Sequence, residues 1–337
     1  MQSRAVGIDL GGTNIKGGLV ERDGTVRAKK SVRTEAAGGA DHVIGRIAGL
    51  VDDLIAEGGA AKTDVVGVCV GSPGPLDSRT GVIYEAPNLD WYDVPLSEKL
   101  APRVGLRVWI ENDANAAAFG EAWVGAGRGL ECVILLTLGT GIGGGIVIGG
   151  RLWRGVHGTG AELGHMTIDY DGVRCNCGSR GCIEAYASAP AVVRRMREAI
   201  DAGGESALRP AFEAGEEVEA RQVYEAAADG DALARAVMEQ TGRFLGIAVA
   251  SFVNIFDPNC VVLHGGMVNA GEMLLGPLVE EMNARSFESC RRGLRVLPSA
   301  LKGDAGLVGA GGCAFAAAER HLPCGWVPRG ADCGRPP

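Results

Sequence analysis

The chain has 337 residues, of which 46% are hydrophobic and 22% charged, and its formal net charge is −8 at pH 7. This balance excludes wholesale disorder, and the length predicts two domains. The acidic charge argues against nucleic acid as a partner, because a phosphate backbone needs clustered Lys and Arg. We recognise no membrane span and no signal peptide, so we expect a cytoplasmic protein that does not bind membranes and whose cysteines stay reduced.

The first part of the chain alternates apolar runs with glycine turns. It predicts strands at 5–9, 15–21, 25–32, 65–70 and 107–110 and helices at 41–57 and 114–123. The pattern then restarts, with expected strands at 132–138, 145–148 and 260–263 and expected helices at 189–199, 220–228, 232–252, from Gly271, and at 304–319.

Because the order of strand, glycine turn and strand occurs twice, we expect two related lobes with βββαβα cores. The first lobe is expected at 1–113, joined by the returning helix 304–319, and the second at 114–303. Residues 320–337 are rich in Gly and Pro and predict a disordered tail.

Three glycine turns follow apolar strands. The backbone N–H groups of such turns can closely approach phosphate oxygens, and an acid beside them can hold hydrated Mg²⁺. Neither of the first two turns is a Walker loop, because no Gly-Lys-Ser/Thr follows. The alternative is that these turns are tight hairpins that bind no ligand. The presence of three such turns in one chain disfavours this alternative. The candidate nucleotide-binding residues are Asp9, Gly11, Gly12, Thr13, Thr140, Gly141, Gly265 and Gly266.

Asp113 follows the strand at 107–110 and is the candidate general base. Phosphoryl transfer to an alcohol needs a group that accepts the hydroxyl proton. The same carboxylate also suits the N-cap of a helix that begins at Ala114. The two roles are compatible.

His165, Cys175, Cys177 and Cys182 predict a metal site. One imidazole and three thiolates form a closed tetrahedral shell for Zn²⁺, which leaves no position for water and makes the metal structural. A redox-active thiol pair and four unrelated residues are the alternatives. The second nitrogen of His165 could also donate to a substrate hydroxyl.

Together these segments resemble the ROK family of sugar kinases and repressors, within the actin-like ATPase superfamily. The matching segments follow the order of the family and cover most of the chain up to about residue 318. Residues 84–91 resemble the glucokinase branch in particular. The matching segments are 9–13, 71–75, 111–117, 138–145, 160–165, 175–184 and 264–266.

The resemblance implies an α/β, two-lobed actin-like (ribonuclease H-like) fold with ATP in the cleft and a zinc-binding segment in the second lobe. It implies Asp113 as the base and Zn²⁺ on the histidine and three cysteines, and it suggests a homodimer or homotetramer. It also implies a set of residues at the sugar, namely Gly74, Asn88, Asn112, Asp113, Glu162, His165 and Glu184.

The predicted reaction is transfer of the γ-phosphoryl group of ATP to the 6-hydroxyl of glucose. A kinase for another hexose, such as N-acetylmannosamine or fructose, is the first alternative. A sugar-responsive repressor is the second, and Asp9 is so near the start that we expect no helix-turn-helix domain in front. A non-catalytic, zinc-stabilised sugar-binding protein is the third, which the presence of Asp9 and Asp113 disfavours.

Overall fold

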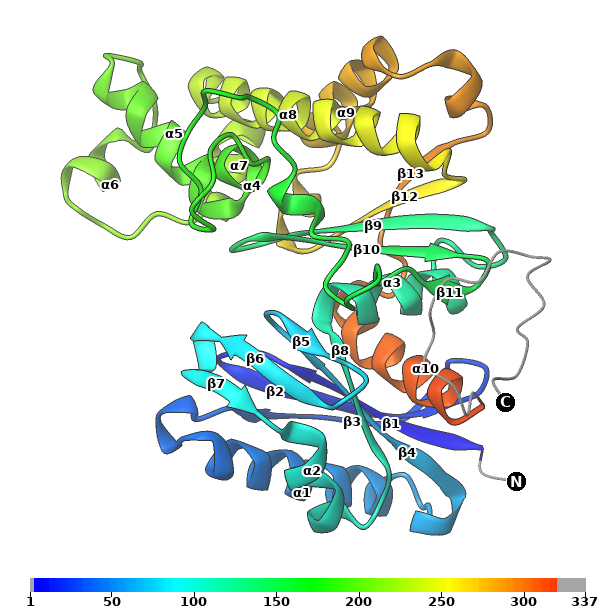
Figure 1. Cartoon of the computed structure of the whole chain (residues 1–337). Coiled ribbons are helices and arrows are strands. Elements are labelled where there is room, and N and C mark those ends of the chain that lie inside the picture. Colours follow the sequence, from blue (N-terminus) through cyan, green and yellow to red (C-terminus); the bar gives the residue numbers. More distant parts are fainter. Residues whose placement is uncertain (1–2, 320–337) are drawn as a thin grey trace. The chain divides into compact units, whose positions relative to one another are not determined.

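The computed structural model describes residues 3–319 (Figure 1). Within this range the chain is mixed α/β with three β-sheets. The contacts between Cα atoms divide it into two compact units. Unit 1 consists of residues 3–113, 151–161 and 310–319, and unit 2 of residues 114–150 and 162–309. The disordered tail expected at 320–337 lies outside the described residues.

The main sheet of unit 1 has the strand order β3-β2-β1-β4-β8. The first three strands pair antiparallel, and β4 and β8 run parallel to β1. Every residue of β4 is buried, as expected of a parallel strand inside a sheet. The strands are β1 (Arg4–Leu10), β2 (Asn14–Glu21), β3 (Val26–Arg33), β4 (Val65–Ser72) and β8 (Val108–Asn112).

Two helices of unit 1, α1 (Ala40–Glu57) and α2 (Leu96–Val104), lie along one face of this sheet (Figure 1). The apolar residues of α1 recur at helical spacing and are buried against the sheet, which explains why this segment is helical. The returning helix α10 (Ala305–Glu319) is highly apolar, and its Phe315 ring lies beneath the Arg22 guanidinium at 4.8 Å.

A second, small sheet of unit 1 was not expected from the sequence. It contains β5 (Leu76–Asp77), β6 (Val82–Ala86) and β7 (Trp91–Val94), in that order and antiparallel. The Trp91 ring is 1% exposed, so this sheet belongs to the core of the unit. The turn between β6 and β7 is a short 3₁₀ helix, Pro87–Leu89.

The sheet of unit 2 contains β10, β9, β12 and β13 side by side in that order. β10 pairs antiparallel with β9, and β12 runs parallel to both β9 and β13. The strands are β9 (Cys132–Leu138), β10 (Ile142–Ile148), β12 (Cys260–His264) and β13 (Arg295–Pro298). The short strand β11 (Arg151–Leu152) begins the segment that clusters with unit 1.

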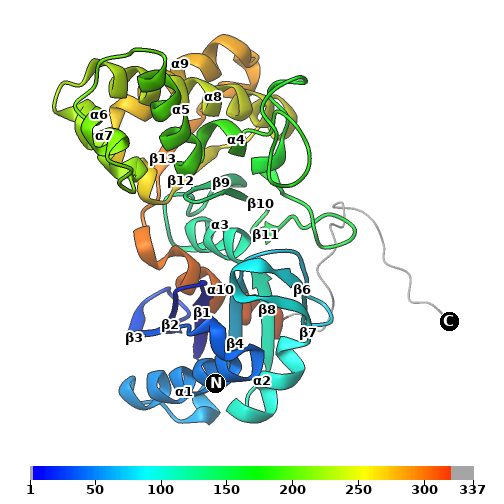
Figure 2. The same cartoon turned by 90° about the vertical axis from the view of Figure 1, so that its left-hand side faces the viewer.

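The long helices of unit 2 pack tightly through glycine. α8 and α9 lie side by side in both views (Figure 1, Figure 2). A Cβ added to Gly242 of α8 would lie 2.4 Å from the Leu274 carbonyl oxygen of α9. The helices are α3 (Asp113–Trp123), α4 (Glu184–Ala187), α5 (Ala189–Asp201), α6 (Arg209–Glu213), α7 (Ala220–Ala228), α8 (Ala232–Phe256) and α9 (Glu272–Arg285). Among residues 3–319, none of the helices combines the length and apolarity needed to span a membrane.

Candidate active site and metal centre

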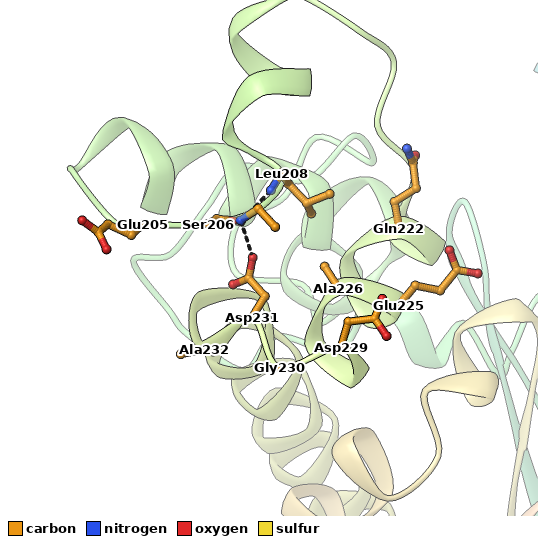
Figure 3. Close-up of a pocket in the computed structure, with 11 residues that line it drawn as sticks. Glu205, Ser206, Leu208, Gln222, Glu225, Ala226, Asp229, Gly230, Asp231 and Ala232 are labelled. Atoms are coloured by element: carbon orange, nitrogen blue, oxygen red, sulfur yellow. Dashed lines mark hydrogen bonds between the residues drawn. The ribbon is translucent and has the colours of Figure 1, made fainter.

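One cavity of unit 2 contains none of the predicted site residues. It has a volume of about 750 Å³ and lies between α7, the start of α8 and the loop before α6 (Figure 3). Its Asp231 accepts hydrogen bonds from the Ser206 hydroxyl at 2.6 Å and from the Ala234 backbone at 2.9 Å. This carboxylate therefore caps α8 and holds a loop, which is a structural role.

The first glycine turn lies between β1 and β2 in unit 1. The Gly11 N–H donates to the Asn14 carbonyl at 3.0 Å, and the buried Thr34 hydroxyl donates to the Gly11 carbonyl at 2.6 Å. A Cβ on Gly11 would lie 2.9 Å from the Asn14 oxygen, so the tight turn requires glycine. Asp9 stands in β1 opposite Gly71 of β4, close to this turn.

Two further predicted residues of unit 1 are placed by the small sheet. Asn88 lies on the 3₁₀ helix between β6 and β7, and a Cβ added to Gly12 would lie 3.2 Å from the Asn88 Cβ. Gly74 has φ +83°, and a Cβ there would lie 2.0 Å from the Glu85 carbonyl oxygen. The structure thus brings Asn88 against the first glycine turn.

Asn112 and Asp113 lie at the junction of β8 and α3. Asn112 ends the strand and Asp113 is the first residue of the helix, and both are half-buried. The preceding Glu111 is 2% exposed, and its Oε2 accepts the Nε–H of Arg154 at 2.8 Å. Its Oε1 accepts the Asn112 backbone N–H at 3.1 Å. An ion pair between the half-buried Arg154 and the buried Glu111 therefore fixes the strand end directly before Asp113.

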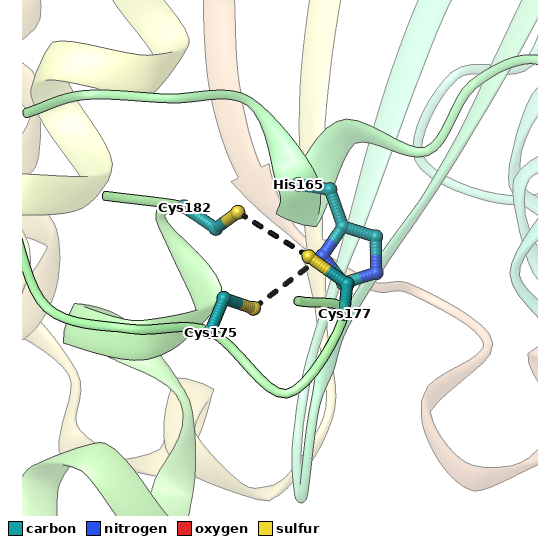
Figure 4. A group of neighbouring side chains, drawn as sticks. All are labelled: His165, Cys175, Cys177 and Cys182. Atoms are coloured by element: carbon teal, nitrogen blue, oxygen red, sulfur yellow. Dashed lines mark hydrogen bonds between the residues drawn. The ribbon is translucent and has the colours of Figure 1, made fainter. Parts of the chain in front are cut away.

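The four predicted metal ligands come together in unit 2. One donor atom from each of His165, Cys175, Cys177 and Cys182 can be chosen so that all lie within 4.8 Å of one another (Figure 4). The Cys177 and Cys182 sulfurs are 3.7 Å apart, and the Cys175 sulfur is 3.8 Å from His165 Nδ1.

These distances fit a tetrahedral zinc shell. Zn–S bonds of about 2.3 Å place two sulfur ligands about 3.8 Å apart around one ion. Burial raises the pKa of the Cys175 thiol to about 12 and also raises the pKa of Cys182. The Ser179 backbone N–H lowers the pKa of Cys177. A cation would supply the positive charge that thiolates need in such surroundings.

Two carboxylates lie near this cluster. Glu162 is exposed as a residue, yet the neighbouring protein partly removes its carboxyl from water, and this desolvation raises its pKa. The charge of His165 opposes the rise, and the charge of Glu184 adds to it. Glu184 is the first residue of α4, and its Oε2 accepts the Ile142 backbone N–H at 2.9 Å. Glu184 therefore lies beside the metal residues, and Glu162 is close enough to His165 for the two charges to interact.

The second and third glycine turns lie at the same end of the unit 2 sheet. The Gly139 N–H donates to the Gly141 carbonyl at 3.0 Å, which closes the second turn around Thr140. Gly265 has φ +108°, and a Cβ there would lie 2.3 Å from the Leu138 carbonyl oxygen. Because Leu138 directly precedes the second turn, Gly265 and Gly266 stand next to it.

A cavity of about 390 Å³ opens between the second turn and the metal cluster. Its lining includes Thr140, Cys175, Glu184, Ser188 and Arg194. Arg194 is held there because it donates to the Ala185 carbonyl at 2.8 Å.

Arg154 is not predicted from the sequence. It pairs with Glu111 across 43 positions of sequence, and no local pattern distinguishes it from a surface arginine.

Known proteins that are similar to this chain in sequence or structure agree with this architecture. The ROK family model matches residues 5–316. A glucokinase from Thermotoga maritima is 41% identical over 91% of this chain and 96% of its own length. A ROK glucokinase from Streptomyces griseus, solved with glucose and AMPPNP, is 37% identical, has a TM-score of 0.78 and aligns over 93% of this chain and 99% of that one. Xylose repressors match at lower identity, 31% for that of Caldicellulosiruptor bescii over 90% of this chain and 76% of the repressor. The chain belongs to the ROK family.

Proposed function

We propose that this protein is an ATP-dependent glucokinase that forms glucose 6-phosphate. The observation that carries the proposal is its similarity, over nearly the whole chain, to glucokinases, one of them solved with glucose and an ATP analogue. The repressors that also match are less similar and are covered only to about three quarters of their length. Phosphoryl transfer is therefore the better supported activity.

In this proposal Asp113 is the general base. It accepts the proton of the glucose 6-hydroxyl as the phosphorus–oxygen bond forms, and ADP leaves with the electrons of the bond that breaks. The ion pair between Glu111 and Arg154 supports this role, because it fixes the end of β8 directly before Asp113. A fixed carboxylate costs less reorganisation at the moment of reaction.

The remaining site residues divide between sugar and nucleotide. Carboxylates and amides are suited to recognising sugars because they form hydrogen bonds with the hydroxyls. A sugar that lacks one of these hydroxyls leaves its carboxylate or amide partner unpaired and therefore binds less well. We infer that the sugar is bound by Asn88, Asn112, Asp113, Glu162, His165 and Glu184, with Gly74 close by. We infer that the triphosphate is bound by Gly11, Gly12, Thr13, Thr140 and Gly141, the nucleoside end by Gly265 and Gly266, and Mg²⁺ through water by Asp9.

His165, Cys175, Cys177 and Cys182 would hold one Zn²⁺. When bound, the ion would crosslink the two segments that carry these ligands. Its four protein ligands would leave no coordination position for water. We also infer the two-lobed actin-like fold, with lobes at 1–113 plus 304–319 and at 114–303, a cytoplasmic location, and a homodimer or homotetramer.

A panel of hexoses assayed with Mg-ATP tests the activity. Glucose should be phosphorylated with the highest kcat/KM, and fructose and N-acetylmannosamine should be poorer by about tenfold or more, because a lost or misplaced hydroxyl leaves buried polar groups unpaired. A higher kcat/KM for another hexose would correct the substrate, and no ATP-dependent transfer to any sugar would refute the kinase proposal.

A further inference from the structure

Glu184 connects the metal cluster to the second glycine turn. It follows the ligand Cys182 by two residues and begins α4. Its Oε1 lies 3.7 Å from the Cys175 sulfur, while its Oε2 accepts the Ile142 N–H at 2.9 Å. Ile142 is the first residue of β10, directly after the turn at 139–141. One carboxylate thus lies beside a metal ligand and accepts the N–H of the residue that follows the turn.

The segment that carries His165 contacts the backbone of the same residue, Ile142. A Cβ added to Gly164 would lie 1.8 Å from the Ile142 carbonyl oxygen, so the two backbones touch. The two ligand-bearing segments are also joined to each other, because the Ile183 N–H donates to the Met166 carbonyl at 2.9 Å. The backbone of Ile142 is therefore contacted by both segments that carry metal ligands.

The other end of the turn is held by the same stretch of chain. The Ala189 N–H donates to the Gly139 carbonyl at 2.8 Å, and Ala189 follows Glu184 by only one short helix. A Cβ on Gly141 would lie 2.6 Å from Glu184 Oε2, so the carboxylate packs directly on the turn. Both ends of the turn are thus held by Glu184 and Ala189, which lie in the stretch of chain directly after the metal ligand Cys182.

We propose that Glu184 is a positioning residue through which metal binding at the cluster strengthens the grip of the Gly139–Gly141 turn on the nucleotide triphosphate. Glycine loses more conformational freedom on ordering than any other residue, so a glycine turn binds phosphate well only when it is already ordered. A bound metal fixes the segments that carry its ligands, including the start of α4 with Glu184. The hydrogen bond from the Ile142 N–H to Glu184 then restricts the motion of the turn. This inference rests on the proposed function and adds a nucleotide role to a residue expected at the sugar.

The test is the affinity for Mg-AMPPNP, measured by calorimetry with and without metal in wild type, Glu184→Ala and Glu184→Gln. Glu184→Ala should weaken binding about tenfold because it removes the acceptor of the Ile142 N–H. Metal removal should weaken binding by a similar factor because the segments around Glu184 lose their order, and the two changes together should weaken it no further. Glu184→Gln keeps an oxygen for Ile142 and should stay within about threefold of wild type. Glu98→Ala removes an exposed glutamate from the first turn of α2 and should change nothing.

Hydrogen exchange at Ile142 gives a second readout that needs no ligand. Its amide should exchange faster in metal-loaded Glu184→Ala than in wild type or Glu184→Gln, while circular dichroism shows that the variant is folded. If metal removal unfolds the protein, the metal-loaded variants alone decide. Unchanged AMPPNP affinity and Ile142 exchange in Glu184→Ala, with only glucose binding weakened, would overturn the inference. If wild type binds AMPPNP but phosphorylates no hexose, the glucokinase proposal fails and the inference is judged by the same binding data.

Discussion

Arg154 donates its Nε–H to Oε2 of Glu111 over 2.8 Å, and the carboxylate that it neutralises is 2% exposed. A buried charge is tolerated only when it is paired. The pair joins the segment at 151–161 to the end of β8 within unit 1, although the two are distant in sequence. It explains how the residues just before Asp113 are held.

Arg154→Met should destabilise the protein by about 3–5 kcal/mol, because it leaves the Glu111 carboxylate buried without the cation that neutralises it. Urea unfolding measures the loss. The double variant Arg154→Met/Glu111→Gln should regain much of it, since no buried charge remains. Arg79→Ala, which removes an exposed arginine that pairs with Asp77, is the control and should cost under about 1 kcal/mol. A loss no greater in Arg154→Met than in Arg79→Ala would contradict this account.

Elemental analysis of the purified protein should find one zinc per chain. Cys175→Ser and His165→Ala should lose the metal and unfold at lower temperature, because each opens a shell whose binding energy also stabilises the fold. Cys290→Ser changes a thiol outside the cluster and should keep both metal and stability. A metal-free protein whose Tm does not respond to added zinc would argue against the site.

Gly74→Ala should destabilise unit 1 by more than Gly39→Ala does. Both glycines have φ near +80°, but a Cβ on Gly74 would lie 2.0 Å from the Glu85 carbonyl oxygen, whereas a Cβ on Gly39 meets nothing within 4 Å. A positive φ costs a side chain about 1–3 kcal/mol at either position, and at Gly74 the steric contact adds to it. Chemical denaturation of the two variants gives the comparison, and equal losses would show that the backbone at Gly74 moves freely away from Glu85.

The sequence predicts best where its signal is local. The apolar spacing at 41–57 and the continuous apolar run at 65–70 match α1 and β4, and the Cys and His spacing identified a cluster whose atoms do converge. Asp113 illustrates a boundary error of one residue, since it begins α3 rather than preceding it.

The rest depends on contacts between distant residues. β5, β6, β7 and β13 are two to five residues long, and too few positions alternate for a strand to be recognised. The ion pair of Glu111 with Arg154 has no local signature, and neither has the bond from Ile142 to Glu184 across 42 positions. Such contacts form only when the fold brings distant residues together, so local sequence patterns do not reveal them.

The most direct test of the central claim is the rate of glucose 6-phosphate formation by wild type and Asp113→Asn, which keeps the shape of the side chain but cannot accept a proton. Removal of a general base lowers kcat by about 10²–10⁴-fold, while glucose and AMPPNP affinities, measured separately, should change by less than about tenfold. A variant that binds both ligands and turns over at the wild-type rate would show that Asp113 is not the base.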